Sequence, residues 1–262
     1  MTNTTVDLKI EDDVAHITLN RPEAANALDL AMARGLFEAA IRCDGHGGVR
    51  AVVLTGAGRA FSAGGDVKAF AAAAERLPAY LKELTAHLHG AVSRLARMDA
   101  PVIAAVNGVA AGAGMGLACA ADIVLAAESA RFTMAYTRLG FTPDGSSTFS
   151  LARLVGLRRA QELLFTNRML TASEALAWNL VTRVVPDAAL SAEADKLARE
   201  LAAGPTRAFG GVKRLLLAAA SNGLETQMEL ETELVTATSR GADGREGPAA
   251  FVAKRPPRFV GA

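Results

Sequence analysis

The 262-residue sequence predicts an α/β protein in which short buried strands pair in parallel, followed by a helical C-terminal segment. Short runs of β-branched and apolar residues, bounded by glycine or proline, recur along the first half of the chain. Helical periodicity separates these runs, and strands that alternate with helices favour parallel pairing. After about Ala188 the pattern becomes wholly helical.

The first elements follow from local signals. Val6–Ile10 and Val14–Leu19 alternate in hydrophobicity around an acidic turn at residues 11–13, which predicts a hairpin. Asp29 can cap a helix that runs to about Arg42. These two elements would begin the core.

Three buried strands and one long helix follow. The strands are expected at residues 51–56 (AVVLTG), 102–106 (VIAAV) and 122–127 (DIVLAA). The helix is expected from about Leu77 to Met98, because apolar and polar positions alternate there at helical spacing.

The change of pattern divides the chain into a core at residues 1–200 and a helical module at residues 201–262. Helix breaks are expected at Gly204-Pro205 and Asn222-Gly223. The module has more apolar residues than one small layer needs, so we expect it to pack against other copies of the chain.

Composition limits the possible functions. The chain is 51% hydrophobic and 21% charged, which indicates a large buried core rather than disorder. Its formal net charge of +1 gives no general attraction for nucleic acid or for an anionic membrane. An anionic ligand would therefore have to bind through a few well-placed cations.

The remaining signals indicate a cytoplasmic protein. Residues 1–20 carry early acidic groups and no apolar signal-peptide region. Residues 101–121 are long and apolar enough to imitate a membrane span, but the Asn107-Gly108 turn interrupts them. Cys43 and Cys119 lie far apart and fit a reducing compartment, and the histidines lack the spacing of metal ligands, so no metal site is expected.

Two glycine-containing loops follow two of the expected strands, at residues 58–70 and 107–122. Such loops expose backbone N–H groups, and two of them side by side can aim two donors at one carbonyl oxygen. The alternative is that the glycines only permit close packing of strand against helix. A dinucleotide site fits less well, since Phe61 and Leu117 stand where the third glycine of that motif belongs.

At these loops the sequence resembles the enoyl-CoA hydratase/isomerase (crotonase) family. Five further stretches agree with the family in order and spacing, namely Asn20–Asp29, Ala100–Gly108, Ala121–Phe132, Leu170–Val185 and Lys254–Phe259. The resemblance implies a crotonase-like spiral superhelix of ββα units with a helical C-terminal trimerisation module. It also implies a homotrimer or homohexamer and an acyl-CoA thioester substrate, with coenzyme A entering as part of the substrate and no separate cofactor.

Position by position, the resemblance assigns an oxyanion hole to the backbone N–H groups of Gly65 and Ala113. Ala63, Gly64 and Gly112 surround these two donors and are expected to contact the substrate. Ala113 stands where many relatives have glycine, a departure that leaves the N–H in place.

Cations for the CoA phosphates are implied in the same way. Lys68 and Lys254 match positions that contact CoA in relatives, and Lys254 would do so in its own or in a neighbouring subunit. Arg21 is a weaker candidate. For Lys68 the alternative is an ordinary solvated lysine on a helix. Asp66 matches a residue that ties down its loop without touching substrate.

The reaction is indicated by departures from the family. Hydratases of the family carry two glutamates that hold and activate water, and here those positions are Gly116 and Tyr136. Glycine cannot transfer a proton, and tyrosine has a pKa of about 10, which is poorly suited to general-base work near neutrality. Tyr136 can instead line the acyl pocket or orient a neighbour.

One carboxylate remains, Asp144, in a Pro-Asp-Gly turn. The ordinary interpretation is a turn residue that caps the helix expected after it. The resemblance favours another role, because family members that move double bonds, the phenylacetate-pathway ring-opening isomerase among them, place their acid at this turn. An apolar wall would raise the pKa of such an acid toward neutrality.

We therefore expect an enzyme that converts a 3-enoyl-CoA to a 2-enoyl-CoA, with Asp144 as the proton shuttle. A hydratase that holds its water differently remains an alternative, as does ring-opening isomerisation with the same residues. A third alternative is a non-catalytic CoA-binding or interaction module.

Overall fold

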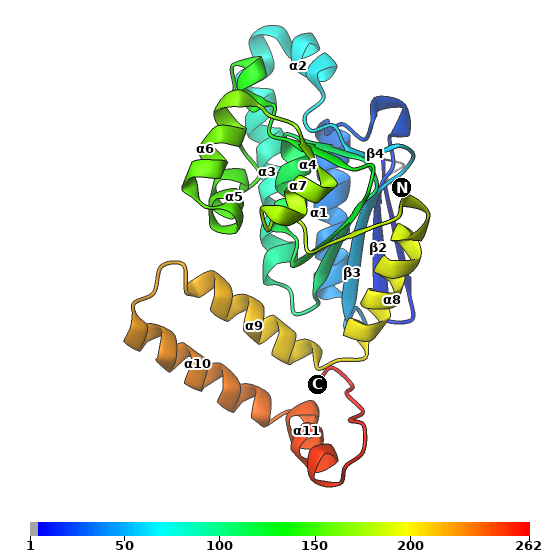
Figure 1. Ribbon diagram of the computed structural model, residues 1–262, viewed down its shortest axis with the longest axis vertical. Coiled ribbons are helices and arrows are strands. Elements are labelled where there is room, and N and C mark those ends of the chain that lie inside the picture. Colours follow the sequence, from blue (N-terminus) through cyan, green and yellow to red (C-terminus); the bar gives the residue numbers. More distant parts are fainter. Residues whose placement is uncertain (1–4) are drawn as a thin grey trace.

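The computed structural model describes residues 5–262. Residues 1–4 begin the N-terminal segment in which no signal peptide is expected, and they lie outside the described residues. Two sheets and the helices around them form the upper body in Figure 1, and three C-terminal helices extend from its lower end. The expected α/β class with parallel pairing is confirmed.

The larger sheet forms the centre of the body and has the order β1-β2-β3-β5-β7-β10. Only β1 and β2 pair antiparallel, as the expected hairpin, and every other pair is parallel. The strands are β1 (Val6–Glu11), β2 (Val14–Leu19), β3 (Ala51–Gly56), β5 (Val102–Val106), β7 (Ile123–Ala127) and β10 (Arg183–Val185).

The smaller sheet was not expected from the sequence. Its order is β4-β6-β8-β9, with β4, β6 and β8 parallel and β9 antiparallel to β8. Strands of two or three residues are too short to show a periodicity of two, so pattern alone does not reveal them. They are β4 (Ala60–Ser62), β6 (Val109–Ala111), β8 (Arg131–Thr133) and β9 (Leu170–Thr171).

Helices cover both sheets. The Asp29 carboxylate accepts a 2.8 Å hydrogen bond from the Met32 N–H and so caps α1, as expected. The helices of this part of the chain are α1 (Leu30–Gly45), α2 (Val67–Ala73), α3 (Leu77–Arg97), α4 (Ala113–Ala120), α5 (Ser147–Val155), α6 (Leu157–Thr166), α7 (Ala172–Ala177) and α8 (Leu190–Ala202), with short 3-10 turns at Pro22–Ala24, Ala74–Arg76, Tyr136–Leu139 and Asp187–Ala189.

One continuous core joins these layers. Ile17, Leu36 and Ile103 are completely buried between the larger sheet and its helices, and Phe61 connects the larger sheet to the smaller one. Full burial of such a side chain contributes about 1.5–3 kcal/mol. The core therefore holds the short strands of the smaller sheet in place.

The C-terminal helices α9 (Thr206–Ala218), α10 (Leu224–Ser239) and α11 (Ala242–Val252) follow the breaks expected at Gly204-Pro205 and Asn222-Gly223. Within the described chain, α10 has no buried residue, and large apolar side chains are exposed on all three helices. No helix of residues 5–262 has the length and hydropathy needed to cross a membrane.

Lys213 anchors α9 to the body of the protein. Its ammonium group donates to the carbonyl oxygens of Leu95 and Ala100 and forms a 2.7 Å ion pair with Asp122. Burial lowers the pKa of Lys213, and the Asp122 carboxylate opposes this effect. Sequence periodicity gave no sign of this buried lysine.

Candidate active site

The candidate site lies where three strands of the smaller sheet end. Because β4, β6 and β8 are parallel, the residues that follow them meet at one edge of the sheet. Residues 63–65 follow β4, Gly112 and Ala113 follow β6, and Tyr136 begins a turn shortly after β8. The register of the short strands thus assembles segments far apart in sequence.

The first loop presents the N–H of Gly65. Leu28 pairs with this loop as an isolated parallel bridge: its N–H donates to Gly64 O, and its carbonyl accepts from the Asp66 N–H. In this bridge the hydrogen bonds are made by the Gly64 carbonyl and the Asp66 N–H, on either side of Gly65, so the Gly65 N–H points away from Leu28. That N–H makes no hydrogen bond within the described part of the chain.

The second loop presents the N–H of Ala113, the first residue of α4. Gly112 precedes it as the N-cap, and the Ala113 N–H likewise has no acceptor among the described residues. The N-terminus of a helix carries partial positive charge, which strengthens the electrostatic attraction between this donor and a negatively charged oxygen.

Gly64 brings the two loops together. Its φ is +86°, and a Cβ placed there would lie 2.6 Å from Ala111 O and 3.3 Å from Ala113 N. Any side chain would therefore push the loops apart. Gly64 does not line the cavity, so its contribution is this close approach rather than contact with a ligand.

A cavity of about 580 Å³ opens in front of both donors. Of the residues expected at the site, Ala63, Gly65, Gly112, Ala113, Tyr136 and Asp144 line it. Most of the remaining wall is apolar and includes Leu81, Leu84 and Phe141. The structure thus brings together two unpaired N–H donors and one carboxylate in a largely apolar chamber.

Asp144 is half-buried, and the hydroxyl of Tyr136 donates a 2.7 Å hydrogen bond to its carboxylate. Burial raises the pKa of Asp144, and the Tyr136 hydrogen bond offsets this only in part. The carboxyl group therefore holds a proton more readily than an exposed aspartate does.

The helix-capping alternative for Asp144 is wrong. The N-cap of α5 is Ser146, which makes no side-chain capping hydrogen bond, and the Ser147 N–H donates to the backbone carbonyl of Asp144 rather than to its carboxylate. The carboxylate faces the cavity and Tyr136 instead.

Ser147 occupies the space beside Gly116. A Cβ added at Gly116 would lie 2.5 Å from Ser147 Oγ, and this hydroxyl also lies 3.3 Å from the Tyr136 hydroxyl. A side chain at position 116 thus has no room as long as Ser147 keeps its place. The sequence gave no signal for Ser147, because the contact depends on how α4 and α5 pack.

Asp66 and Arg21 brace the first loop. The Asp66 carboxylate caps α2 by accepting from the Lys68 and Ala69 N–H groups. Burial raises its pKa, but the hydrogen bonds from Ala69 and Arg21 outweigh this and lower the pKa overall. Arg21 forms ion pairs with Asp66 at 3.1 Å and with Asp29 at 3.0 Å. Its guanidinium group is therefore already paired within the protein, which makes it a poor candidate for binding a CoA phosphate.

The two lysines expected to bind phosphate lie far apart. Lys68 is exposed on α2, beside the loop of Gly65. Lys254 is exposed in the segment after α11, at the opposite end of the molecule from α2 (Figure 1). A single chain therefore does not bring Lys254 to the cavity.

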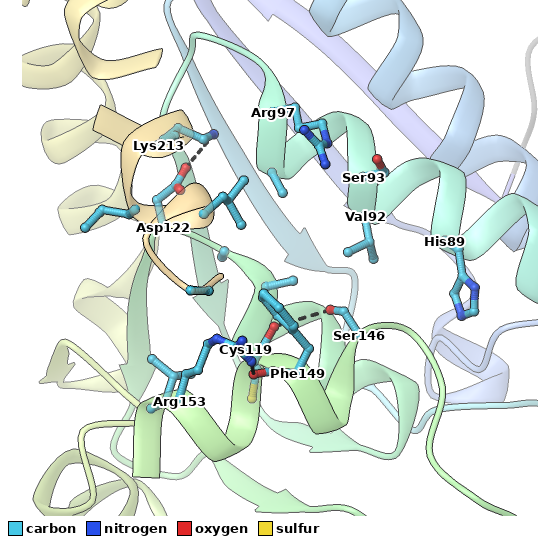
Figure 2. Close-up of a pocket in the computed structure, with 18 residues that line it drawn as sticks. His89, Val92, Ser93, Arg97, Cys119, Asp122, Ser146, Phe149, Arg153 and Lys213 are labelled. Carbon is cyan, nitrogen blue, oxygen red and sulfur yellow. Dashed lines mark hydrogen bonds and ion pairs between the residues drawn. The ribbon is translucent and has the colours of Figure 1, made fainter. Parts of the chain in front are cut away.

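A larger cavity of about 670 Å³ lies between α3, α5 and α9 (Figure 2). Its charged groups include Lys213 and Asp122, which pair with each other, and burial raises the pKa of the Cys119 thiol to about 12. Such a thiol is a poor nucleophile. The larger cavity lacks the pair of unpaired N–H donors, so we place the chemistry in the smaller one.

Phe70 and Phe141 add an aromatic surface to the smaller cavity. Their ring centroids are 6.2 Å apart, and the Phe70 ring also meets Tyr80 edge-on at 6.0 Å. Phe70 belongs to α2, and Phe141 lies three residues before Asp144, so the aromatic surface joins the first loop to the Asp144 turn.

These features define an α/β fold with two unpaired N–H donors at one cavity, and comparison with known proteins identifies the family. The family model for enoyl-CoA hydratase/isomerase matches residues 9–262. The chain belongs to this family, and the expected crotonase-like fold is confirmed.

Relatives within the family carry different names. The 1,2-epoxyphenylacetyl-CoA isomerase of Escherichia coli is 41% identical over 96% of this chain and 97% of its own. A 4-chlorobenzoyl coenzyme A dehalogenase of Arthrobacter is 36% identical over 89% of this chain and 85% of its own. The crystal structure of an enoyl-CoA hydratase from Polaromonas has a TM-score of 0.92 at 34% identity, over 97% of this chain and 99% of that one. The family is therefore shown, and acyl-CoA chemistry with it, whereas the relatives differ in reaction.

Proposed function

We propose that the protein is an enoyl-CoA isomerase that moves a double bond from the 3- to the 2-position of an acyl-CoA thioester. The observation that carries the proposal is the placement of one half-buried carboxylate, Asp144, in the same cavity as the unpaired N–H groups of Gly65 and Ala113.

The oxyanion hole would act on the thioester. The carbonyl oxygen accepts from Gly65 and Ala113, and negative charge that develops on it during enolate formation is stabilised there. Each such donor is worth about 2.7–4 kcal/mol in comparable sites. Since the thioester itself holds the electrons, the reaction requires no metal or redox cofactor.

Asp144 would move the proton. Its carboxylate takes a proton from C2 of the 3-enoyl group, the electrons flow into the thioester carbonyl, and the resulting acid returns the proton to C4. The raised pKa suits both halves of this cycle, because the same group must accept and then release a proton. Tyr136 holds the carboxylate in place between the two steps.

Hydration is less well supported. The two positions that hold water-activating glutamates in hydratases are Gly116 and Tyr136 here, and the Ser147 hydroxyl fills the space beside Gly116. Among the described residues that line the cavity, there is therefore no second carboxylate to orient a water molecule.

A second candidate is isomerisation of a ring-derived acyl group by the same residues. The aromatic surface formed by Phe70, Phe141 and Tyr136 favours a flat acyl group, since aromatic rings pack edge-to-face or offset against one another. The Escherichia coli relative is named for such a substrate.

Binding and assembly complete the proposal. Lys68 would contact a CoA phosphate beside the first loop, and Lys254 would do so only from a neighbouring subunit. The exposed apolar side chains of α9 to α11 favour a homotrimer or homohexamer. The formal net charge of +1 gives no support for a nucleic-acid or membrane partner, and we place the protein in the cytoplasm as part of this proposal.

Asp144→Asn tests the proposed reaction. Incubation of the wild-type protein with a 3-enoyl-CoA should yield the 2-enoyl-CoA, and the variant should lose this activity by a factor of roughly 10² or more. Binding of a saturated acyl-CoA should stay near normal, because the oxyanion hole does not use that side chain. An Asp144→Asn enzyme with full activity would contradict the mechanism, and hydration of a 2-enoyl-CoA without isomerisation would favour the hydratase.

A further inference from the structure

Asp144 begins a tight turn that contains a residue in a strained conformation. The Ser147 N–H donates to Asp144 O at 2.9 Å, and the two residues between them, Gly145 and Ser146, have φ of +58° and +64°. This is the geometry of a type I′ turn. Ser146 has a Cβ, so its left-handed conformation costs about 1–2 kcal/mol.

Two neighbouring residues of α3 support this turn from outside. His89 Nε2 accepts a 3.0 Å hydrogen bond from the Gly145 N–H, which the turn itself leaves without an acceptor. Leu88, the residue before it, is completely buried, and its Cδ2 would lie 3.3 Å from a Cβ at Gly145. The helix thus holds the backbone next to Asp144 by one hydrogen bond and one packed side chain.

His89 contacts the turn from the side of the larger cavity and not from the active-site cavity. Its ring lines the larger cavity together with Ser93 and Ser146, and it extends from α3 toward the end of that cavity where Ser146 lies (Figure 2). His89 does not line the smaller cavity. Its hydrogen bond to the turn is made to the backbone N–H of Gly145, next to the proposed proton carrier.

We propose that His89 is a positioning residue for Asp144. The proposal rests on the proposed isomerase function. Tyr136 holds the carboxylate at its oxygen, and His89 holds the backbone from which that carboxylate extends. The role needs the neutral imidazole with its proton on Nδ1, because Nε2 accepts. Proton transfer to substrate depends on a distance controlled within about an ångström, so a loosened turn slows the chemistry more than it weakens binding.

Two amide substitutions at His89 separate positioning from mere packing. His89→Gln carries its amide oxygen at about the reach of Nε2 and can accept from Gly145, whereas His89→Asn is too short. Both are neutral, polar and unable to act as an acid or base. Ser93→Ala, on the same helix and in the same cavity, is the matched control.

We expect His89→Asn to lower kcat for 3-enoyl-CoA isomerisation roughly fivefold, the factor that one neutral hydrogen bond is worth. KM should change less than about twofold, because the contacts of the oxyanion hole are untouched. His89→Gln should keep most of the wild-type kcat, and Ser93→Ala all of it.

Hydrogen–deuterium exchange of residues 139–149 gives a readout that does not depend on turnover. Exchange at Gly145 should speed up in His89→Asn and stay slow in His89→Gln. If His89→Asn matches the wild type in kcat and in exchange, or if both amides lose activity equally, the positioning role is wrong. A wild-type protein without isomerase activity would contradict the proposed function instead, and this is seen before any variant is compared.

Discussion

The hydroxyl of Tyr136 donates a 2.7 Å hydrogen bond to the carboxylate of Asp144, at the wall of a largely apolar cavity. Burial raises the pKa of Tyr136, and the negative charge of Asp144 raises it further, so the hydroxyl keeps its proton and remains a donor. Tyr136, which the resemblance aligns with a glutamate of the hydratases, thus holds Asp144, the one carboxylate among the described residues that line the cavity.

Removal of this hydroxyl should alter the pH dependence of the reaction. In Tyr136→Phe the hydrogen bond that lowers the pKa of Asp144 is lost, so that pKa should rise further above its ordinary value. Because Asp144 must be ionised to take the proton, the fall of kcat/KM toward acid should move to higher pH. We also expect kcat at neutral pH to decrease roughly tenfold, from loss of orientation.

The control for this variant is Ser147→Ala, which removes the 3.3 Å neighbour of the Tyr136 hydroxyl and leaves the bond to Asp144. Steady-state rates from pH 4 to 9 measure both variants. If kcat/KM of Tyr136→Phe falls toward acid at the same pH as that of the wild type, the Tyr136 hydrogen bond does not set the pKa of Asp144.

Asp144→Asn should also change the stability of the protein in a pH-dependent way. The folded-state pKa of Asp144 lies above its unfolded value, so the folded state binds more protons between the two values, and ionised Asp144 costs stability at higher pH. At pH 8 we expect the Tm of the Asn variant to equal or exceed that of the wild type. The difference should shrink as the pH falls through the raised pKa of wild-type Asp144, below which this carboxyl group is neutral.

Thermal unfolding of both proteins across this pH range measures the effect. A Tm of Asp144→Asn that lies well below that of the wild type at pH 8 would show that the carboxylate stabilises the fold. Asp187→Asn is a useful reference, because the Ser129 hydrogen bonds lower the pKa of that carboxyl and the sign should be opposite.

CoA affinity should depend on Lys68. Lys68→Ala ought to weaken binding of an acyl-CoA severalfold, and the loss should diminish as salt is added, since phosphate contacts are screened. Lys82→Ala, an exposed lysine of α3, is the matched control. Lys254→Ala should weaken binding only if the assembled protein brings a second copy to the site, and calorimetric titration at several salt concentrations measures all three.

The C-terminal helices should hold several chains together. Leu224 on α10 and Phe251 on α11 are 68% and 85% exposed, which is unusual for large apolar side chains in a monomer. Light scattering at micromolar concentration should give the mass of three or six chains, and Leu224→Asp with Phe251→Asp should reduce it. A wild-type monomer would contradict this assembly.

Much of the fold was determined by the sequence alone. The hairpin, the strands of the larger sheet at residues 51–56 and 102–106, and the cap at Asp29 follow from local patterns that do not depend on distant contacts. The glycine loops and the Pro-Asp-Gly turn could also be located from the sequence, but it was the resemblance to the family that named Gly65, Ala113 and Asp144 within them.

Only the tertiary structure decided how these residues act together. The short strands β4, β6 and β8 have no readable periodicity, yet their parallel register brings the two N–H donors and the acid to one edge. The packing of α5 on α4 decides that Ser147 fills the space at Gly116, and the approach of α3 places His89 on the Asp144 turn. Such contacts join residues 30 to 60 positions apart. A local pattern cannot encode them, because they depend on how whole elements pack.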